Sequence, residues 1–377
     1  MSIRQHNLGS IVKPGFNPLG AQTTTTQSTL FSWGYNHRGQ LGLSNLTSYS
    51  SPNQVGALTD WLTVACGYYH NVATKNNGTL WTWGWSANGQ LGLGNTTTYS
   101  SPKQVGALTA WSKVAGGGSS SAAIKTDGTL WTWGYNSDGQ LGDGTITQRN
   151  SPVQIGALTN WASIGVLSRA TLAVKTDGTL WSWGNGAFGA LGLGNTTSYS
   201  SPKQVGALTA WLKVAGSFYS SFAIKTDGTL WTWGYNNQGQ LGLGDITNRS
   251  SPVQVGALTT WLTVASGNYN SVAVKTDGTL WTWGKGTNGG LGLGNTTNYS
   301  SPKQVGALTT WLSISAGFYF CGAVKTDGTA WTWGYNSQGQ LGLSTAYSLN
   351  KSSPTQIGSL TTWSKVTCGS GYYCLGI

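Results

Sequence analysis

Short runs of alternating apolar and polar residues, separated by glycine-rich turns, recur along the chain. Within the segment Trp111–Ala157, the runs Trp111–Ala115 and Ser121–Lys125 alternate, and Thr129–Trp133 places Thr between Leu and Trp. Alternation with a period of two is typical of β-strands. The tripeptide Thr-Asp-Gly at 126–128 has the composition of a hairpin turn. The segment therefore predicts three antiparallel strands in succession.

The same segment returns with a period of 50 residues, and a short fourth strand is predicted in it after Pro152, at Val153–Ile155. A fixed period of this length indicates a solenoid or a propeller, and four strands without a helix signal form a propeller blade. We therefore expect an all-β fold, a closed seven-bladed β-propeller with four-stranded blades of 50 residues. Three tryptophan series keep the period, and Trp85 alone lies outside them. The Trp-Gly pairs that mark the units begin at Trp33, Trp83, Trp133, Trp183, Trp233, Trp283 and Trp333.

The two ends of the repeat region are complementary. The chain enters the repeat at Thr29–Trp33, a third strand, and stops at Tyr373–Ile377, a second strand. Pairing these two strands closes the ring and leaves no free strand edge. We predict this clasp between the N- and C-terminal segments, with residues 29–377 as the propeller and residues 1–28 as an extended N-terminal arm.

The number and distribution of charged residues argue against several classes of protein. Only 8% of residues are charged, no Glu occurs, and the net charge is +11. A chain without Glu is not expected to contain much helix. The Lys and Arg residues are spread evenly, so the clustered footprint of a specific nucleic-acid binder is missing. Apolar runs are too short for a membrane-spanning helix, and the first residues lack the apolar region of a secretory signal.

The residues that carry chemistry do not converge. Five of the nine Asp stand in the Asp-Gly turns, the other four lie in separate loops, and the three His have different sequence contexts. We therefore expect no catalytic residue, no metal and no cofactor, and a protein that is not an enzyme. The G-x-G-x-x-G matches at 184–189 and 284–289 are followed by Leu-Gly-Leu-Gly, where no helix is expected to bind phosphate. The cysteines fit neither a zinc site nor a disulfide framework, and we expect small buried side chains at Cys66, Cys321, Cys368 and Cys374.

The unit Val64–Val105 resembles the repeat of the regulator of chromosome condensation family, with Ala-Cys-Gly-x-x-His, a Gly turn, Trp-Gly, Gly-Gln-Leu-Gly and then Pro. The resemblance covers residues 29–377 and implies a seven-bladed propeller. Cys66 and His70 match motif positions that are structural in this family. The family name suggests guanine-nucleotide exchange, but the units carry no inserted wedge, only a two-residue insertion in the last one. Exchange activity is therefore the weaker alternative.

The N-terminal arm supplies the first functional hypothesis. Residues 1–28 do not match the repeat and carry spaced apolar residues, as expected for an arm that docks onto a neighbouring subunit. Low-charge β modules with such arms resemble phage virion proteins. We therefore predict a structural or interaction protein of the virion, capsid-decorating or tail-associated, with other virion proteins as partners and the cytoplasm as the alternative location. The candidate anchors are Ile3, Leu8, Ile11, Val12, Phe16 and Leu19.

A carbohydrate-binding propeller is the second hypothesis. Repeated aromatic loops on blades give lectins several identical sites and hence avidity. Tyr99, Tyr199 and Tyr299 each lie in a polar loop of Asn, Thr and Ser, and are the candidate stacking residues for host-surface glycans. The alternative for these tyrosines is that they cover the edges of the blades.

Overall fold

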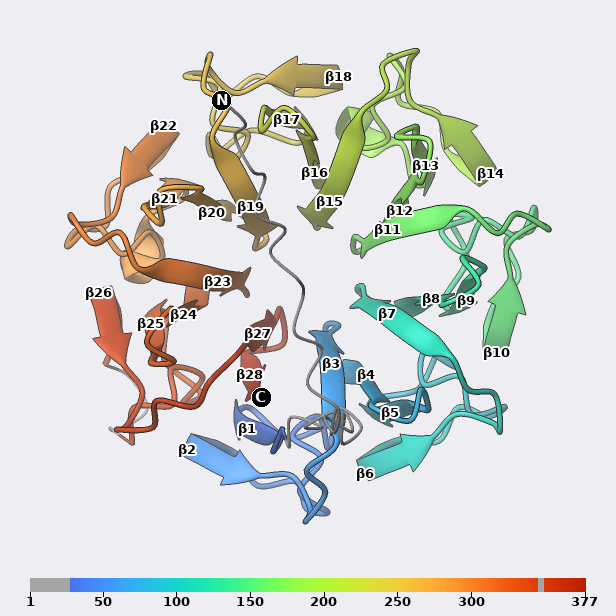
Figure 1. The fold of residues 1–377 in the computed structure, drawn as a ribbon, viewed down its shortest axis with the longest axis horizontal. Helices are drawn as coiled ribbons and strands as arrows, with labels where there is room; N and C mark the ends of the chain where they lie inside the picture. Colours follow the sequence, from blue (N-terminus) through green and yellow to red (C-terminus); the bar gives the residue numbers. More distant parts are fainter. Residues whose placement is uncertain (1–27, 345–348) are drawn as a thin grey trace, which may run out of the picture.

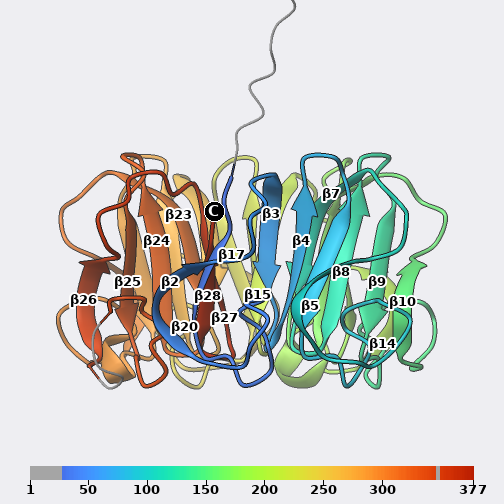
Figure 2. The same cartoon turned by 90° about the horizontal axis from the view of Figure 1, so that it is seen from below.

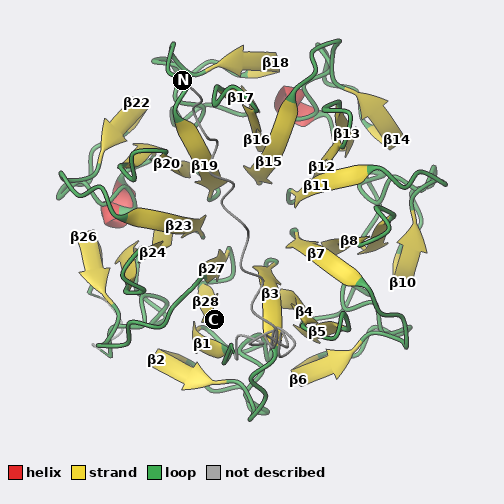
Figure 3. Cartoon of the chain, in the orientation of Figure 1, coloured by secondary structure: helices red, strands yellow, loops and turns green. Residues whose placement is uncertain are grey.

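The computed structural model describes residues 28–344 and 349–377, which form seven four-stranded antiparallel sheets arranged as a ring (Figure 1). Each sheet is a blade whose first strand lies nearest the axis (Figure 3). Blade 1 combines β27 and β28 with β1 and β2, and blades 2 to 7 follow in chain order from β3–β6 to β23–β26. The predicted seven-bladed propeller is confirmed. Seen from the side, the blades form a short, broad cylinder (Figure 2).

The strands follow the repeat closely. The first strands of the blades are β27 (Val366–Gly369), β3 (Trp61–Cys66), β7 (Trp111–Gly116), β11 (Trp161–Val166), β15 (Trp211–Ser217), β19 (Trp261–Ser266) and β23 (Trp311–Ala316). The second strands are β28 (Tyr373–Gly376), β4 (His70–Lys75), β8 (Ser120–Lys125), β12 (Ala170–Lys175), β16 (Ser220–Lys225), β20 (Asn270–Lys275) and β24 (Phe320–Lys325). The third strands are β1 (Phe31–Gly34), β5 (Leu80–Gly84), β9 (Leu130–Gly134), β13 (Leu180–Gly184), β17 (Leu230–Gly234), β21 (Leu280–Gly284) and β25 (Ala330–Gly334). The outer strands are β2 (Tyr49–Gln54), β6 (Tyr99–Gln104), β10 (Arg149–Gln154), β14 (Tyr199–Gln204), β18 (Arg249–Gln254), β22 (Tyr299–Gln304) and β26 (Lys351–Gln356).

The outer strand begins earlier than the sequence suggested. In blade 3 it starts at Arg149 and contains Pro152, whereas the prediction placed it after the proline. Proline lacks an amide donor, but the outer strand is an edge strand and the pairing is irregular between Arg149 and Val153. The missing donor therefore interrupts no regular ladder.

The tryptophans of the Trp-Gly pairs pack against the preceding blade, and within the described ranges all of them except Trp333 also donate a hydrogen bond to it. These indoles are fully buried, and that of Trp83 donates its Nε1–H to the backbone carbonyl of Gln40 at 3.0 Å. The same bond recurs from Trp133 to Gln90 at 2.9 Å. A buried indole needs an acceptor for its N–H, and here the neighbouring blade provides it. Blade-to-blade contact is thus both apolar and hydrogen-bonded.

The predicted clasp is confirmed in blade 1. Strands β1 and β28 pair antiparallel, with Phe31 opposite Gly376 and Trp33 opposite Cys374. The prediction that none of the four cysteines forms a disulfide was wrong for two of them, because Cys368 and Cys374 are bridged, whereas Cys66 and Cys321 are free. The two bridged residues are direct partners in the β27–β28 ladder with a Cα–Cα distance of 4.2 Å, a close approach that only the hairpin pairing creates.

Helical structure in the described ranges is confined to two 3-10 turns, η1 (Ala187–Gly189) and η2 (Thr287–Gly289). They stand in the two G-x-G-x-x-G loops, where the sequence indicated no helix. Each is three residues long, which is too short to provide the N-terminal dipole of a phosphate site. Among the described residues, no helix is long and apolar enough to cross a lipid bilayer.

Candidate functional site

The two ends of the cylinder carry different connections. One end, the loop face, holds the turns between first and second strands and the loops that follow each Trp-Gly pair. A backbone hydrogen bond ties the two in each blade, as from Trp85 N to Tyr69 O at 2.9 Å and from Tyr335 N to Tyr319 O at 3.0 Å. The other end, the turn face, holds the Asp-Gly turns and the connections to the next blade. Long connecting loops on one face are where propellers can vary side chains without disturbing the strands.

Aromatic side chains, half-buried except for the exposed Phe188, surround the centre of the loop face, and we call this set the aromatic crown. The rings contact one another across blades: Tyr269 stacks on Tyr319 with centroids 5.7 Å apart, and Phe318 meets Tyr372 edge-on at 5.4 Å. The crown consists of Tyr35, Tyr68, Tyr69, Trp85, Tyr135, Phe188, Phe218, Tyr219, Tyr235, Tyr269, Phe318, Tyr319, Tyr335 and Tyr372.

The first turns of blades 3 and 4 contribute no aromatic residue to the crown. Blade 2 has Tyr68 and Tyr69 in its first turn, and blade 3 has Gly118 and Ser119 in the same slots. The backbone of blade 4 fills the space beside the glycine, since a Cβ at Gly118 would lie 2.8 Å from the carbonyl oxygen of Ser168. The small residues open a pocket of about 420 Å³ between blades 2, 3 and 4. Its walls are Tyr68, Tyr69, Trp85, Asn88, Gly118, Ser119, Tyr135, Ser168 and Arg169.

This loop-face pocket combines flat rings with polar and cationic groups. The guanidinium of Arg169 lies at the wall and pairs with Asp138 at 3.5 Å. Arg38 lies over the Trp85 ring at 6.0 Å, and no carboxylate of the described chain pairs with it. Burial raises the pKa of the Tyr68 and Tyr69 hydroxyls, so both remain protonated donors at neutral pH. A ligand here meets stacking surfaces, hydroxyl donors and positive charge.

The tyrosines proposed from the sequence lie elsewhere. Tyr99, Tyr199 and Tyr299 are the first residues of the outer strands β6, β14 and β22, on alternate blades, so they do not share a site. Each ring is half-buried and has a lysine ammonium above it, 5.4–5.6 Å from the centroid. Their role in glycan binding stays a prediction. The arm anchors Ile3, Leu8, Ile11, Val12, Phe16 and Leu19 fall outside the described residues.

Sequence reasoning missed the crown and its pocket because they combine loops from several blades. Two signals were nevertheless present. Trp85 is the single tryptophan outside the three structural series, and Gly118-Ser119 departs from the aromatic pair of the neighbouring unit. Deviations from the repeat, more than the repeat itself, mark this pocket.

The acidic residues and the buried histidine have structural partners. Asp127 accepts hydrogen bonds from Thr129 N at 2.9 Å and Thr129 Oγ1 at 2.7 Å, an arrangement repeated in the other Asp-Gly turns. His70 is fully buried beside Ser121, with Nε2 to Oγ at 2.9 Å, and burial lowers its pKa to about 4. Within the described ranges, no three His, Cys, Asp or Glu residues gather as a metal site would require. Desolvation raises the pKa of the Cys66 thiol to about 12, so it is no nucleophile at neutral pH.

Solved structures with the same fold include known proteins of eukaryotes. Prp20p from Saccharomyces cerevisiae, described with its binding to Gsp1p and histones, is 20% identical with a TM-score of 0.83, covering 94% of this chain and 92% of Prp20p. Human WBSCR16 is 21% identical with a TM-score of 0.82, covering 92% of this chain and 98% of that protein. At these identities the likeness concerns the fold alone. No curated protein sequence matches the chain.

The similarity in sequence runs through the repeat region. The model of the RCC1-like domain matches residues 29–375, which is all but the last two residues of the predicted propeller. The fold, the closure in blade 1 and this match agree on one assignment. The chain belongs to the RCC1-like domain family.

Proposed function

We propose that this protein is a non-catalytic interaction propeller that binds its partner through the loop face. The observation that carries the proposal is the loop-face pocket, where Tyr69, Trp85 and Tyr135 line a cavity of about 420 Å³ beside Arg169. Aromatic and arginine side chains dominate the energetics of protein interfaces because they bury much area and retain a polar or charged tip. Solved relatives of this fold include yeast RCC1 (Prp20) bound to Kap60, at 20% identity and a TM-score of 0.83, covering 100% of this chain and 96% of that one.

The absence of catalysis is part of the proposal. Support comes from the way the candidate acids and bases are used: Asp143 is held by Arg149 at 2.7 Å, Asp245 by Arg249 at 2.5 Å, and His70 is buried. A general acid or base must reach a substrate proton, and these groups are committed to neighbouring side chains. Nucleotide release from a small GTPase, measured with a fluorescent guanine nucleotide, is the decisive check, and release above the spontaneous rate would contradict the proposal.

We propose further that the interaction takes place in a phage virion, with residues 1–28 as the anchor. This rests on the sequence, on the apolar residues of the arm and the low charge of the propeller. The test deletes residues 1–28 and counts copies of the protein in purified particles by mass spectrometry. Loss of incorporation with a folded propeller supports the anchor, and full incorporation refutes it.

The loop face is tested separately by photo-crosslinking. A benzophenone amino acid placed at Trp85 is expected to give a discrete adduct with the partner in assembled material. The same amino acid at Leu262, an exposed position on the first strand of blade 6, is the matched control. Equal adducts from both positions, or adducts from Leu262 alone, would contradict binding at the loop face.

Glycan binding is the second candidate function, and the composition of the same pocket favours it. Aromatic rings with neighbouring Asn88, Ser119 and Ser168 are the groups that stack on sugars and bond to their hydroxyls. A glycan array separates the two lectin hypotheses. Binding that Trp85→Ala abolishes places the sugar in the pocket, whereas binding lost only when Tyr99, Tyr199 and Tyr299 are all replaced by Ala places it at the outer strands.

A further inference from the structure

A lysine caged by two tryptophans recurs at the outer side of the blades. In blade 4, Lys175 ends the second strand, and its Nζ lies 5.0 Å from the Trp161 ring and 3.8 Å from the Trp181 ring. We call this unit a Trp-Lys-Trp cage. Cation–π attraction accounts for the position of the ammonium over the rings but provides no hydrogen-bond acceptor for it. The cage lysines of blades 2 to 7 are Lys75, Lys125, Lys175, Lys225, Lys275 and Lys325.

The cages of blades 4 and 7 open into grooves between adjacent blades. The groove at blade 4 measures about 500 Å³ and the one at blade 7 about 390 Å³. The two grooves are lined by residues at equivalent positions of the repeat. One side of each groove is the outer strand of the preceding blade. The other side is a Ser-Pro pair in the outer strand of the blade that holds the cage, Ser201-Pro202 in blade 4 and Ser353-Pro354 in blade 7. The half-buried third-strand indole forms a flat wall. The shared lining at blade 4 is Gln154, Leu158, Trp161, Lys175, Trp181 and Pro202, and at blade 7 Gln304, Leu308, Trp311, Lys325, Trp331 and Pro354.

Each groove contains a caged ammonium that is accessible to water and a buried indole N–H without an acceptor. Lys175 is 8% exposed and Lys325 is 7% exposed, and within the described chain neither forms an ion pair, although Asp177 and Asp327, two residues further on, act on them electrostatically. The buried Nε1–H groups of Trp161 and Trp311 lack acceptors, although the equivalent Trp111 donates to Leu108 O at 3.1 Å. Buried donors normally have partners, because leaving them unpaired is costly. The pair of donors points to a ligand that brings acceptor oxygens.

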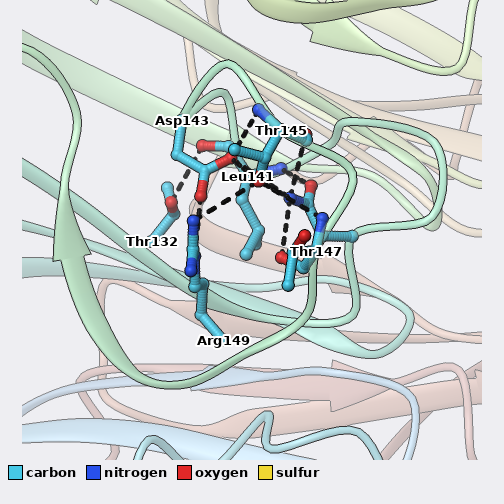
Figure 4. A network of polar contacts seen from close by, with 7 residues as sticks. Thr132, Leu141, Asp143, Thr145, Thr147 and Arg149 are labelled. Atoms are coloured by element: carbon cyan, nitrogen blue, oxygen red, sulfur yellow. Dashed lines mark hydrogen bonds and ion pairs between the residues drawn. The ribbon is translucent and has the colours of Figure 1, made fainter.

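The acid that lines the blade 4 groove, Asp143, is already engaged. It accepts from Arg149 Nε at 2.7 Å and from Thr145 Oγ1 at 2.7 Å (Figure 4). Asn136 adds a third donor at 3.2 Å. The carboxylate therefore has its charge and its lone pairs satisfied within its own loop and is not the partner of Lys175.

In blade 2, a carboxylate of the chain itself pairs with the caged lysine. There Lys75 Nζ lies 3.2 Å from Asp60 Oδ1, so the chain itself supplies a carboxylate to the caged ammonium. The backbone of Ser28 forms an isolated parallel β-bridge with that of Asp60. The other five blades have residues that cannot provide the charge at this position, namely Ala110, Asn160, Ala210, Thr260 and Thr310.

We propose that the grooves of blades 4 and 7 each bind an Asp or Glu side chain of an extended, acidic segment of a partner protein. The carboxylate forms an ion pair with the lysine Nζ, as Asp60 does with Lys75 in blade 2, and in addition accepts from the indole Nε1–H. Apolar atoms next to it lie along the half-buried indole and the proline. The net charge of +11 attracts such a segment over longer range. This site is separate from the loop-face pocket, so either proposal can fail without the other.

The test follows indole Nε1–H resonances of ¹⁵N-tryptophan-labelled protein during titration with a capped hexapeptide that contains three aspartates. The same peptide with three asparagines is the control ligand. We expect the Trp161 and Trp311 signals, assigned through Trp161→Phe and Trp311→Phe, to shift only with the acidic peptide. Lys175→Met and Lys325→Met keep the aliphatic packing and remove the charge, and each is expected to weaken binding at its own groove roughly tenfold or more.

Control variants test whether the lysine charge is responsible for binding of the acidic peptide. Lys175→Arg retains the charge and is expected to retain binding, and Lys113→Met removes a cation from the first strand β7 without affecting it. Asp60→Asn is expected to make the Trp61 signal respond to the acidic peptide for the first time. Equal shifts with both peptides, or unchanged binding in the methionine variants, overturn the proposal. A response to trigalacturonate with none to the peptide overturns it too, since the cages would then be acidic-sugar sites.

Discussion

The disulfide between Cys368 and Cys374 makes a specific prediction about the stability of blade 1. The bridge links β27 to β28, and β28 is the strand that pairs with β1 to close the ring. Removing it with Cys368→Ala and Cys374→Ala releases a loop with a sequence separation of 6. The loop-closure relation gives about 2 kcal/mol for a loop this short. Unfolding entropy scales with chain length and reaches roughly 0.8 kcal/mol per kelvin for a chain of this size, so the expected fall in Tm is about 3 °C.

The assay is differential scanning calorimetry at one scan rate, with and without a phosphine reductant. Reductant is expected to lower the Tm of the wild-type protein to that of the double variant and to leave the variant unchanged. Thiol titration of the denatured, unreduced protein is expected to count two thiols, those of Cys66 and Cys321. Four thiols, or a wild-type Tm that does not respond to reductant, would refute the reasoning.

Three further predictions follow from the described structure. Deleting Gly371–Ile377 removes the fully buried strand β28. Because burial of each large apolar side chain contributes about 1.5–3 kcal/mol, we expect the Tm to fall by many degrees. A truncated chain that melts at the same temperature as the full chain contradicts the clasp. The pKa of His70 is near 6.5 in the unfolded chain and about 4 in the folded one, so the free energy of unfolding falls as the pH drops below 6.5 and is about 3 kcal/mol lower at pH 4. We expect His70→Asn, which introduces the residue found at Asn270 of blade 6, to remove this pH dependence. Denaturant titrations at several pH values measure it. Gly84→Ala is expected to destabilise the fold in the same titrations, because φ is +99° and the new Cβ would lie 2.4 Å from the carbonyl oxygen of Tyr69.

The fold could be predicted well from the sequence because each blade corresponds to one sequence repeat. The tryptophan period determines the number of blades, and the chain ends determine how blade 1 closes. Local exceptions were harder to predict: the outer strand includes Pro152 because an edge tolerates a missing donor, and Cys368 meets Cys374 because a tight hairpin aligns them. Neither outcome follows from composition or spacing.

The candidate sites were predicted much less well, for a physical reason. A pocket between blades depends on side chains that are far apart in sequence and become neighbours only in the closed ring. The loop-face pocket joins Trp85 to Arg169, and the groove at blade 4 joins Gln154 to Trp181. Repetition identifies the residues that build the blade, whereas the sites arise where one unit differs from its neighbours or where two units meet.

The composite blade also has a consequence for synthesis of the protein. Among the strands of the propeller, β1 and β2 are translated before all the others, and their partners β27 and β28 after all the others. At roughly 5–20 residues per second, a chain of this length takes about 20–75 s to complete. Throughout that interval the third strand of the future blade 1 exposes an unpaired edge, as does the growing end of the arc. Newly made chains are therefore open to strand exchange with one another, and slow translation or crowded polysomes favour intertwined dimers over closed rings.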